Sequence, residues 1–256
     1  MIPDAIDSDP SFGLLLGATA VAALVVGFLR TAIGGGIGLV LTPTLSFVLP
    51  PAVVLALIAP LMNLSDPIAV RYYWRQWDGA LLRLLLPSSV LGVVAGMWLL
   101  SSLPQMWLAR TVGAVALLFA MAQLTLSLRR PALPGGAPPP WPVGVGAGFV
   151  MGVASMVAHS GGVVLNLYLL ALRLPTTTIL ATGNALIVFT NAVKLLGYWR
   201  VGFLTGSIVL AAVLVIPLLT VGAWLGVRVG RRLPRRAFEL TLIGTAIVGA
   251  VRLLLR

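Results

Sequence analysis

Residues 27–43 read GFLRTAIGGGIGLVLTP and place three successive glycines, Gly34, Gly35 and Gly36, between two apolar stretches. Glycine adopts backbone angles that other residues avoid, and three in a row leave their amide groups uncovered by side chains. At membrane depth such backbone must face protein or a water-filled cavity, because lipid offers no hydrogen bonds. The stretch therefore predicts a helix that is broken inside a membrane.

A weaker copy of this stretch, GVASMVAHSGGVVLNLY, runs from Gly152 to Tyr168 and contains the break Ser160-Gly161-Gly162. Short apolar runs follow the two breaks, at Ile37–Leu49 and Val163–Leu172. A helix needs about 17–25 residues to cross roughly 30 Å of hydrocarbon. Both runs therefore predict short, broken or re-entrant helices.

The composition of the 256 residues supports a membrane protein, with 59% hydrophobic and only 9% charged residues. Soluble domains have about 45–50% apolar and about 25% charged residues. Without cysteine the chain has no disulfide, thiolate nucleophile or iron–sulfur cluster, and with one histidine it has no multi-histidine metal centre. We expect no metal, no cofactor and no catalytic site. The net charge of +11 reflects arginines in short loops, so we expect no nucleic-acid partner.

The sequence predicts an all-α, polytopic membrane helical bundle. Its longer apolar runs are Phe12–Leu29, Ala52–Val70, Leu81–Leu100, Met106–Leu128, Val143–Ala158, Thr178–Leu196, Phe203–Val229 and Ala237–Leu255. The Pro- and Gly-rich segment 129–142 predicts a linker between two transmembrane units, 12–128 and 143–256. Residues 1–11 contain three Asp and no basic residue, unlike a signal peptide, so we expect an uncleaved extracytoplasmic tail.

The two units repeat the same order of features. The glycine breaks lie 126 residues apart, and Tyr73-Trp74-Arg75 recurs 125 residues later as Tyr198-Trp199-Arg200, two turns that predict interfacial aromatic anchors. Five more positions recur after 130 residues, so that Pro87, Gly92, Gly96, Leu103 and Pro104 match Pro217, Gly222, Gly226, Leu233 and Pro234. A five-residue insertion before Pro217 accounts for the longer offset. Both G-x-x-x-G pairs predict close helix packing.

Loop charges predict that the second unit is inverted, giving two inverted repeats of about five elements each. Cytoplasmic loops collect Lys and Arg. With the N-terminus outside, the inner loops contain Arg71, Arg75, Arg83, Arg129, Arg130, Arg173, Arg228, Arg231, Arg232, Arg235 and Arg236, and the outer connections only Arg200. We therefore expect both termini outside and the linker in the cytoplasm.

The stretch from Gly27 to Pro43, its echo from Gly152 and the aromatic–arginine turns resemble the sulfite exporter TauE/SafE family of membrane transporters. The resemblance extends over nearly the whole chain. It implies secondary transport of small sulfur-containing anions such as sulfite, sulfonates or sulfoacetate, usually outward across the inner membrane. The second half departs from the family's three glycines, because His159-Ser160 precedes Gly161-Gly162.

The two glycine breaks are the first candidate for substrate binding. Uncovered amides at the start of a short helix form a nest for an oxyanion near the midplane. This interpretation assigns the site to Gly34, Gly35, Gly36, Ser160, Gly161 and Gly162. A tight turn or close helix packing is the alternative.

Further candidates are polar residues inside apolar runs, where an ionisable group costs roughly 2.5–3.5 kcal/mol on insertion scales. Lys194, the only lysine, is predicted to attract the anion or else to extend to the outer interface. Asp66 is predicted to gate or carry a proton, or else to cap a helix end, and we do not expect it to pair with Lys194. His159 is predicted to switch with pH or to be structural. Asn184 and Asn63 would donate to sulfonate oxygens or connect helices.

The leading hypothesis is an inner-membrane exporter of small sulfur-containing anions. An anion channel, a structural membrane subunit and, less favoured, an intramembrane enzyme remain as alternatives. We expect an anionic substrate and membrane lipid as partners, and the sequence allows a homodimer. The particular anion, the coupling ion and the oligomeric state do not follow from the residues.

Overall fold

The computed structural model describes residues 12–32, 37–129, 140–172, 174–229 and 235–255. This part of the chain contains eleven helices and no strand, which confirms the all-helical prediction there. The helices are α1 (Phe12–Ala32), α2 (Ile37–Leu45), α3 (Pro51–Tyr72), α4 (Gly79–Ser102), α5 (Gln105–Arg129), α6 (Trp141–Ala158), α7 (Gly161–Ala171), α8 (Thr176–Val201), α9 (Gly206–Leu214), α10 (Ile216–Val229) and α11 (Arg235–Leu254).

Five of the described helices, α1, α4, α5, α6 and α8, are long and apolar enough to cross a membrane, and the bent pair α9–α10 can form a sixth span. Many large apolar side chains on their outer faces are exposed, including Leu91, Trp98, Leu118 and Leu196. A protein in water would bury such a surface, whereas lipid accepts it. The chain is therefore a multi-pass membrane protein.

The predicted element at Phe203–Val229 is bent in the structure. It consists of two helices, α9 and α10, which meet at Val215 with a bend of 49°. The corresponding helix of the first unit, α4, is continuous. Val215 alone separates α9 from α10, and Pro217 follows in the first turn of α10.

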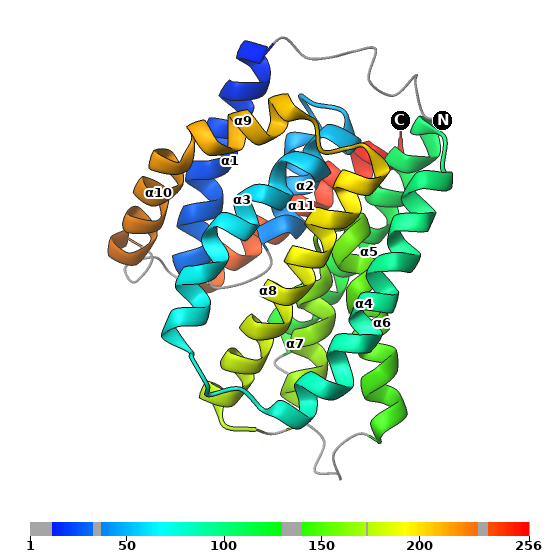
Figure 1. Ribbon diagram of the computed structural model, residues 1–256, viewed down its shortest axis with the longest axis vertical. Helices are drawn as coiled ribbons and strands as arrows, with labels where there is room; N and C mark the ends of the chain where they lie inside the picture. Colours follow the sequence, from blue (N-terminus) through cyan, green and yellow to red (C-terminus); the bar gives the residue numbers. More distant parts are fainter. Residues whose placement is uncertain (1–11, 33–36, 130–139, 173, 230–234, 256) are drawn as a thin grey trace.

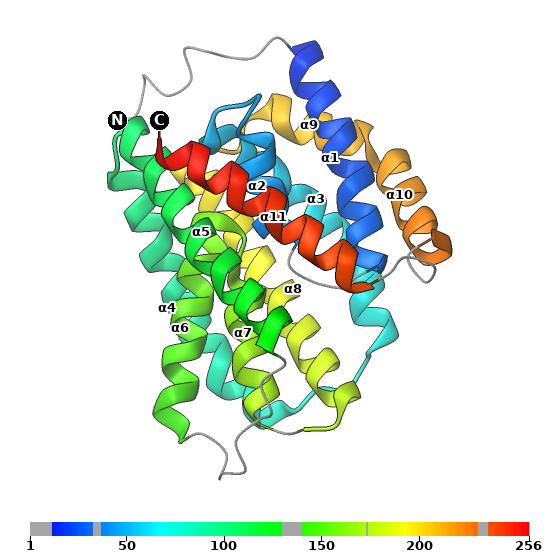
Figure 2. The same ribbon diagram turned by 180° about the vertical axis from the view of Figure 1, so that it is seen from behind.

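The predicted short elements are present as α2 and α7, of 9 and 11 residues. At 1.5 Å per residue they are about 14 and 17 Å long, roughly half of the hydrocarbon thickness. Both lie in the interior of the bundle beside the central helices α3 and α8 (Figures 1 and 2). They have the length of half-helices.

Close helix packing explains the G-x-x-x-G pairs, as the sequence predicted. A side chain at Gly92 of α4 would collide with the Phe149 carbonyl of α6. In the same way, a side chain at Gly222 of α10 would collide with the Leu24 carbonyl of α1. Glycine is required at these points because the two backbones touch.

The two contacts are the same contact made twice, since Gly222 follows Gly92 by 130 residues and Phe149 follows Leu24 by 125. A second pair repeats the relation: Gly27 of α1 lies against the Leu219 carbonyl of α10, and Gly152 of α6 lies against the Ser89 carbonyl of α4. Each half thus packs its first helix against the fourth element of the other half. The remaining close neighbours include α5 with α11 and α3 with α8.

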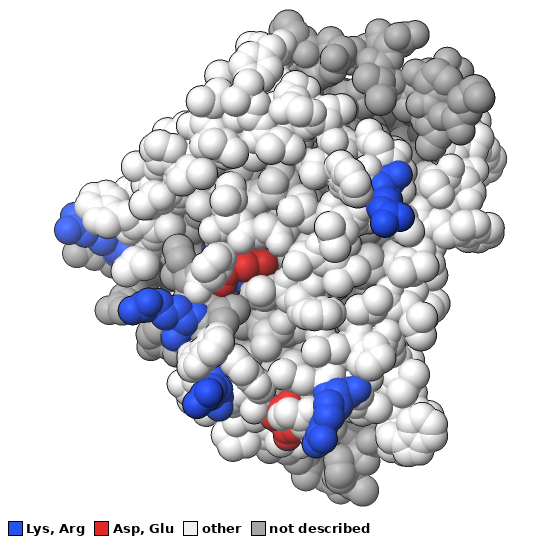
Figure 3. Space-filling view, viewed as in Figure 1, with Lys and Arg blue, Asp and Glu red and all other residues white. Residues whose placement is uncertain are grey.

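Figures 1 and 2 show at which end of the bundle several of the helices begin or end. The first turn of α1 and the last turn of α11 lie at the upper end, whereas α6 begins at the lower end and runs opposite to α1. On the face drawn in Figure 3, the basic side chains lie mostly in the lower half, over the region of the α3–α4 connection. Arg71 in the last turn of α3 and Arg75 in the connection are both exposed.

Candidate functional site

The second break is a sharp turn between α6 and α7. Helix α6 ends at Ala158, and His159 takes the left-handed conformation, with φ 52° and ψ 24°. This geometry lets the amide of Ser160 donate to the Ala154 carbonyl and closes the helix end. Helix α7 starts directly afterwards at Gly161. The first amides of a helix have no carbonyl one turn earlier within it, and in the first turn of α7 the Val163 amide donates to the Ser160 carbonyl.

The first break, Gly34 to Gly36, lies outside the described residues. Gly38, the second residue of α2, contacts His159 so closely that a side chain at Gly38 would collide with the His159 backbone and Cβ. The start of α2 therefore lies against the second break. This contact brings the segments next to the two breaks together in the interior.

His159 is connected to the central helices through both ring nitrogens. Nε2 lies 3.1 Å from the Leu55 carbonyl of α3, and Nδ1 lies 2.9 Å from Nζ of Lys194 on α8. A carbonyl only accepts, so Nε2 carries a proton and donates to Leu55. In the neutral ring Nδ1 then accepts from the Lys194 ammonium. The ring of Tyr198, one turn after Lys194, lies 5.8 Å from that of His159.

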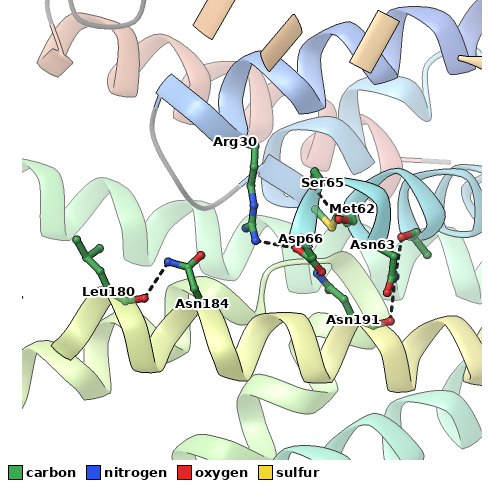
Figure 4. A network of polar contacts seen from close by, with 9 residues as sticks. Arg30, Met62, Asn63, Ser65, Asp66, Leu180, Asn184 and Asn191 are labelled. Carbon is green, nitrogen blue, oxygen red and sulfur yellow. Dashed lines mark hydrogen bonds and ion pairs between the residues drawn. The ribbon is translucent and has the colours of Figure 1, made fainter. Parts of the chain in front are cut away.

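Asp66 of α3 is the anionic counterpart of these groups. Its Oδ1 accepts from Nη2 of Arg30 at 2.7 Å, and its Oδ2 accepts from the amide of Asn191 at 2.9 Å (Figure 4). Lys194 also attracts the Asp66 carboxylate electrostatically. Asn191 and Lys194 are three residues apart and therefore share one face of α8. We call Arg30, Asp66, His159, Asn191 and Lys194 the central polar cluster.

The burial of the cluster excludes two of the alternatives drawn from the sequence. Lys194 is only 1% exposed, so it does not extend to the outer interface. Asp66 is 2% exposed and lies within α3 rather than at its end, so it is not a helix cap. As expected, no direct bond joins Asp66 to Lys194 among the contacts of the described residues.

The predicted polar ligands make local or interhelical bonds. The Asn63 amide donates to the Ala59 carbonyl in its own helix and to the Asn191 carbonyl of α8, as in the interhelical alternative (Figure 4). The Asn184 amide donates to the Leu180 carbonyl one turn earlier. Asn184 is half-buried and lies two turns before Asn191 on the same face of α8.

The residues of the second break are partly used in packing. The Ser160 hydroxyl is buried and donates to the Ala154 carbonyl. A side chain at Gly161 would run into the Met151 carbonyl, 2.5 Å from the added carbon, and into Ser155 of α6. Gly162 follows in the first turn of α7 and is half-buried. The packing role of Gly161 is therefore present whether or not its amide binds an anion.

The sequence reasoning missed Arg30 and misplaced Tyr198. Arg30 lies one turn before the first break, and this position is the local signal that could have identified it as a candidate. Tyr198 was expected at the interface with Trp199. Trp199 is exposed, whereas Tyr198 is fully buried and its hydroxyl donates to the Met156 carbonyl.

The cluster can hold an anion but has no set of metal ligands. The described residues contain no group of three or more His, Asp or Glu side chains close enough to bind a metal ion. With Lys194 protonated, Arg30 and Lys194 carry two positive charges against the one negative charge of Asp66. The buried centre then has one positive charge in excess, which a monovalent anion neutralises.

Comparison with known proteins agrees with this geometry. The model of the family described as sulfite exporter TauE/SafE matches residues 19–253, nearly the whole chain and all the residues of the central polar cluster. No curated protein and no solved structure matches the chain in these comparisons. The family consists of membrane transporters of sulfite and related anions. The chain belongs to the sulfite exporter TauE/SafE family.

Proposed function

We propose that the protein is a secondary transporter of small sulfur-containing anions, of the sulfite, sulfonate or sulfoacetate type, and that it exports them across the cell inner membrane by alternating access. One observation carries the proposal: Arg30, Lys194 and Asp66, two basic groups and one carboxylate, form a buried cluster next to the point where the start of α2 contacts the second break. Uncompensated charge in a membrane interior is expensive, so it is retained where it serves an ion pathway. An anionic substrate completes the charge balance.

The reciprocal packing of the halves supports a two-fold relation between them. The first helix of each half contacts the fourth element of the other, by matched residues such as Gly92 with Phe149 and Leu24 with Gly222. A contact that is restored when the two halves are exchanged is the mark of a two-fold axis. Translation of one half along the other would not return the contact to its starting pair.

The direction of that axis follows from the helix order and the charges. Helices α1 and α6 hold equivalent places and run in opposite directions (Figure 1), which fits an axis in the membrane plane and hence inverted repeats. The arginine-rich connections then face the cytoplasm, with both termini outside. In carriers built this way the two halves rock about a shared midplane site, which gives alternating access.

The amides at the start of α7, with Ser160, Gly161 and Gly162, contribute to this site together with Gly34 to Gly36. Lys194 supplies charge, and Asn184 and Asn63 supply nearby amides on α8 and α3. Asp66 and His159 act in gating or proton coupling. Because Nε2 of His159 donates to Leu55, the His159–Lys194 hydrogen bond excludes the state in which the ring and the lysine are both charged, since Nδ1 and Nζ would then face each other as donors.

Flux through proteoliposomes tests the proposal. Purified protein would be reconstituted, and uptake of radiolabelled sulfite, ethanesulfonate and sulfoacetate measured against protein-free vesicles. Saturable uptake that is accelerated by unlabelled anion on the opposite side is expected for a carrier. Unsaturable conductance would support a channel instead, and no flux of any of these anions would reject the transport proposal.

A further inference from the structure

Arg30 is the most unusual member of the central polar cluster. It lies in the last turn of α1, its side chain is 9% exposed, and Nη2 forms the 2.7 Å ion pair with Asp66. Among the described residues, its Nε is buried and has no hydrogen-bond partner. The guanidinium therefore has a donor that no described residue satisfies and that bulk water does not reach.

An unsatisfied donor of this kind is rare, because a buried polar group without a partner loses its hydrogen bonds to water and forms none within the protein. The guanidinium offers five N–H donors in a flat fork that matches two oxygens of an oxyanion. Sulfite and sulfonates present three oxygens around one sulfur, so one of these anions can accept from Nε and from an adjacent Nη at the same time. Asp66 uses only part of this fork.

We propose that Arg30 is the principal ligand of the transported oxyanion and that Asp66 is an internal competitor, which shares the guanidinium until the anion arrives. The inference rests on the proposed transport function and names the side chain that recognises the substrate. An incoming sulfite or sulfonate accepts from Nε and displaces the carboxylate from Nη2. The substrate thus takes the place of a fixed anion rather than entering an empty cavity.

The surroundings of Asp66 make this exchange feasible. When Arg30 turns to the substrate, Asp66 keeps its hydrogen bond from Asn191 and its attraction to Lys194. The carboxylate is therefore not left without partners, which would strongly oppose the exchange. In the absence of substrate, Asp66 holds Arg30 in place and balances its charge.

Arg110 provides the matched control. Its Nε is also buried without a partner, but its guanidinium lies over the ring of Trp107, with 5.3 Å from Cζ to the ring centre, near the start of α5. No carboxylate pairs with it among the ion pairs of the described residues. A loss of binding caused by removing an arginine in general would appear in Arg110→Gln as well as in Arg30→Gln.

The experiment compares wild type, Arg30→Gln, Asp66→Asn, Arg110→Gln and the double variant Arg30→Gln/Asp66→Asn, each purified and monodisperse. Binding of sulfite and of ethanesulfonate is measured by calorimetry, and flux in proteoliposomes. We expect Arg30→Gln to weaken binding by roughly tenfold to more than a hundredfold, as for lost hydrogen bonds to a charged group. Asp66→Asn should bind more tightly than wild type because the competing carboxylate is gone, and Arg110→Gln should bind as wild type does.

The double variant keeps the test valid if a single charge left unpaired prevents folding. It removes both charges with little change of shape, so it should fold and fail to bind. Near-wild-type affinity in Arg30→Gln or in the double variant would reject the assignment of Arg30 while wild-type flux still supports transport. Weaker binding in Asp66→Asn would reject the competitor role. Absence of saturable binding and flux in the wild type would reject the transport function and this inference together.

Discussion

The amide of Asn191 donates a 2.9 Å hydrogen bond to the carboxylate of Asp66, and the two residues hold the same position in the two halves, 125 residues apart. For halves related by the two-fold axis that we propose, two equivalent positions touch each other only next to that axis. The proposal therefore places this pair beside the centre about which the halves are arranged. It also explains how one half came to carry the acid and the other its neutral amide: two carboxylates in contact would repel each other.

Exchanging these two residues tests the pairing. Asn191→Asp places two carboxylates side by side and Asp66→Asn leaves Arg30 without its counter-ion, so each should lower the thermal stability in detergent. The exchange variant Asp66→Asn/Asn191→Asp restores an amide–carboxylate hydrogen bond and the net charge. Its loss should be smaller than the sum of the single losses, by about 0.5–3 kcal/mol. Additive losses would show that the two side chains are not coupled.

Most of the fold could be predicted from sequence because the signals are local or periodic. Apolar run length located the helices, and the offsets of Pro87 and Gly92 from Pro217 and Gly222 are the basis for proposing a repeat. The candidate site was harder to predict, because the burial of a side chain depends on which helix faces which. Nothing local distinguishes Lys194 at an interface from Lys194 against His159, and Arg30 directly follows the predicted apolar run Phe12–Leu29. Only the packing of α1, α3 and α8 brings these charges together.

The matched glycine contacts predict matched effects on stability. Gly27→Ala and Gly152→Ala each place a methyl group against a carbonyl of the partner helix, so each should destabilise the protein by about 1–3 kcal/mol. Gly17→Ala in α1 and Gly146→Ala in α6 are the controls, since an added carbon meets nothing within 4 Å at either position. Thermal unfolding in detergent measures all four. Equal stability of Gly152→Ala and Gly146→Ala would contradict the close contact of α4 with α6.

Gly161→Val separates packing from anion binding at the second break. The added side chain collides with the Met151 carbonyl and Ser155, so we expect a large fall in folded, monodisperse protein rather than a selective loss of transport. Size-exclusion chromatography and thermal unfolding measure folding, and calorimetry measures sulfite binding. A variant that folds with normal stability but no longer binds sulfite would instead favour the amides of α7 as the main ligands.

The membrane orientation can be tested with single cysteines, because the chain has none of its own. Ala137→Cys lies in the linker that we expect in the cytoplasm, and Ser102→Cys lies at the end of α4 that we expect outside. Both are compared in intact cells treated with a membrane-impermeant thiol reagent. Labelling of Ser102→Cys alone, with Ala137→Cys labelled only after permeabilisation, is the expected result. The opposite pattern would reverse the orientation.

His159→Gln tests the shared proton of the His159–Lys194 hydrogen bond. A glutamine amide can donate to the Leu55 carbonyl while its oxygen accepts from Lys194, so it reproduces both hydrogen bonds but cannot take up a proton. The groups around it, Lys194, Asp66, Arg30 and the Tyr198 hydroxyl, are unchanged. We therefore expect His159→Gln to fold and bind sulfite with nearly wild-type affinity, whereas His159→Ala, which leaves the buried Lys194 ammonium without its acceptor, should be unstable.

In proteoliposomes, an imposed pH gradient should drive sulfite flux through the wild type and have little effect on His159→Gln. If the variant responds to the gradient as strongly as the wild type, the coupling proton does not pass through His159, and Asp66 becomes the residue to examine.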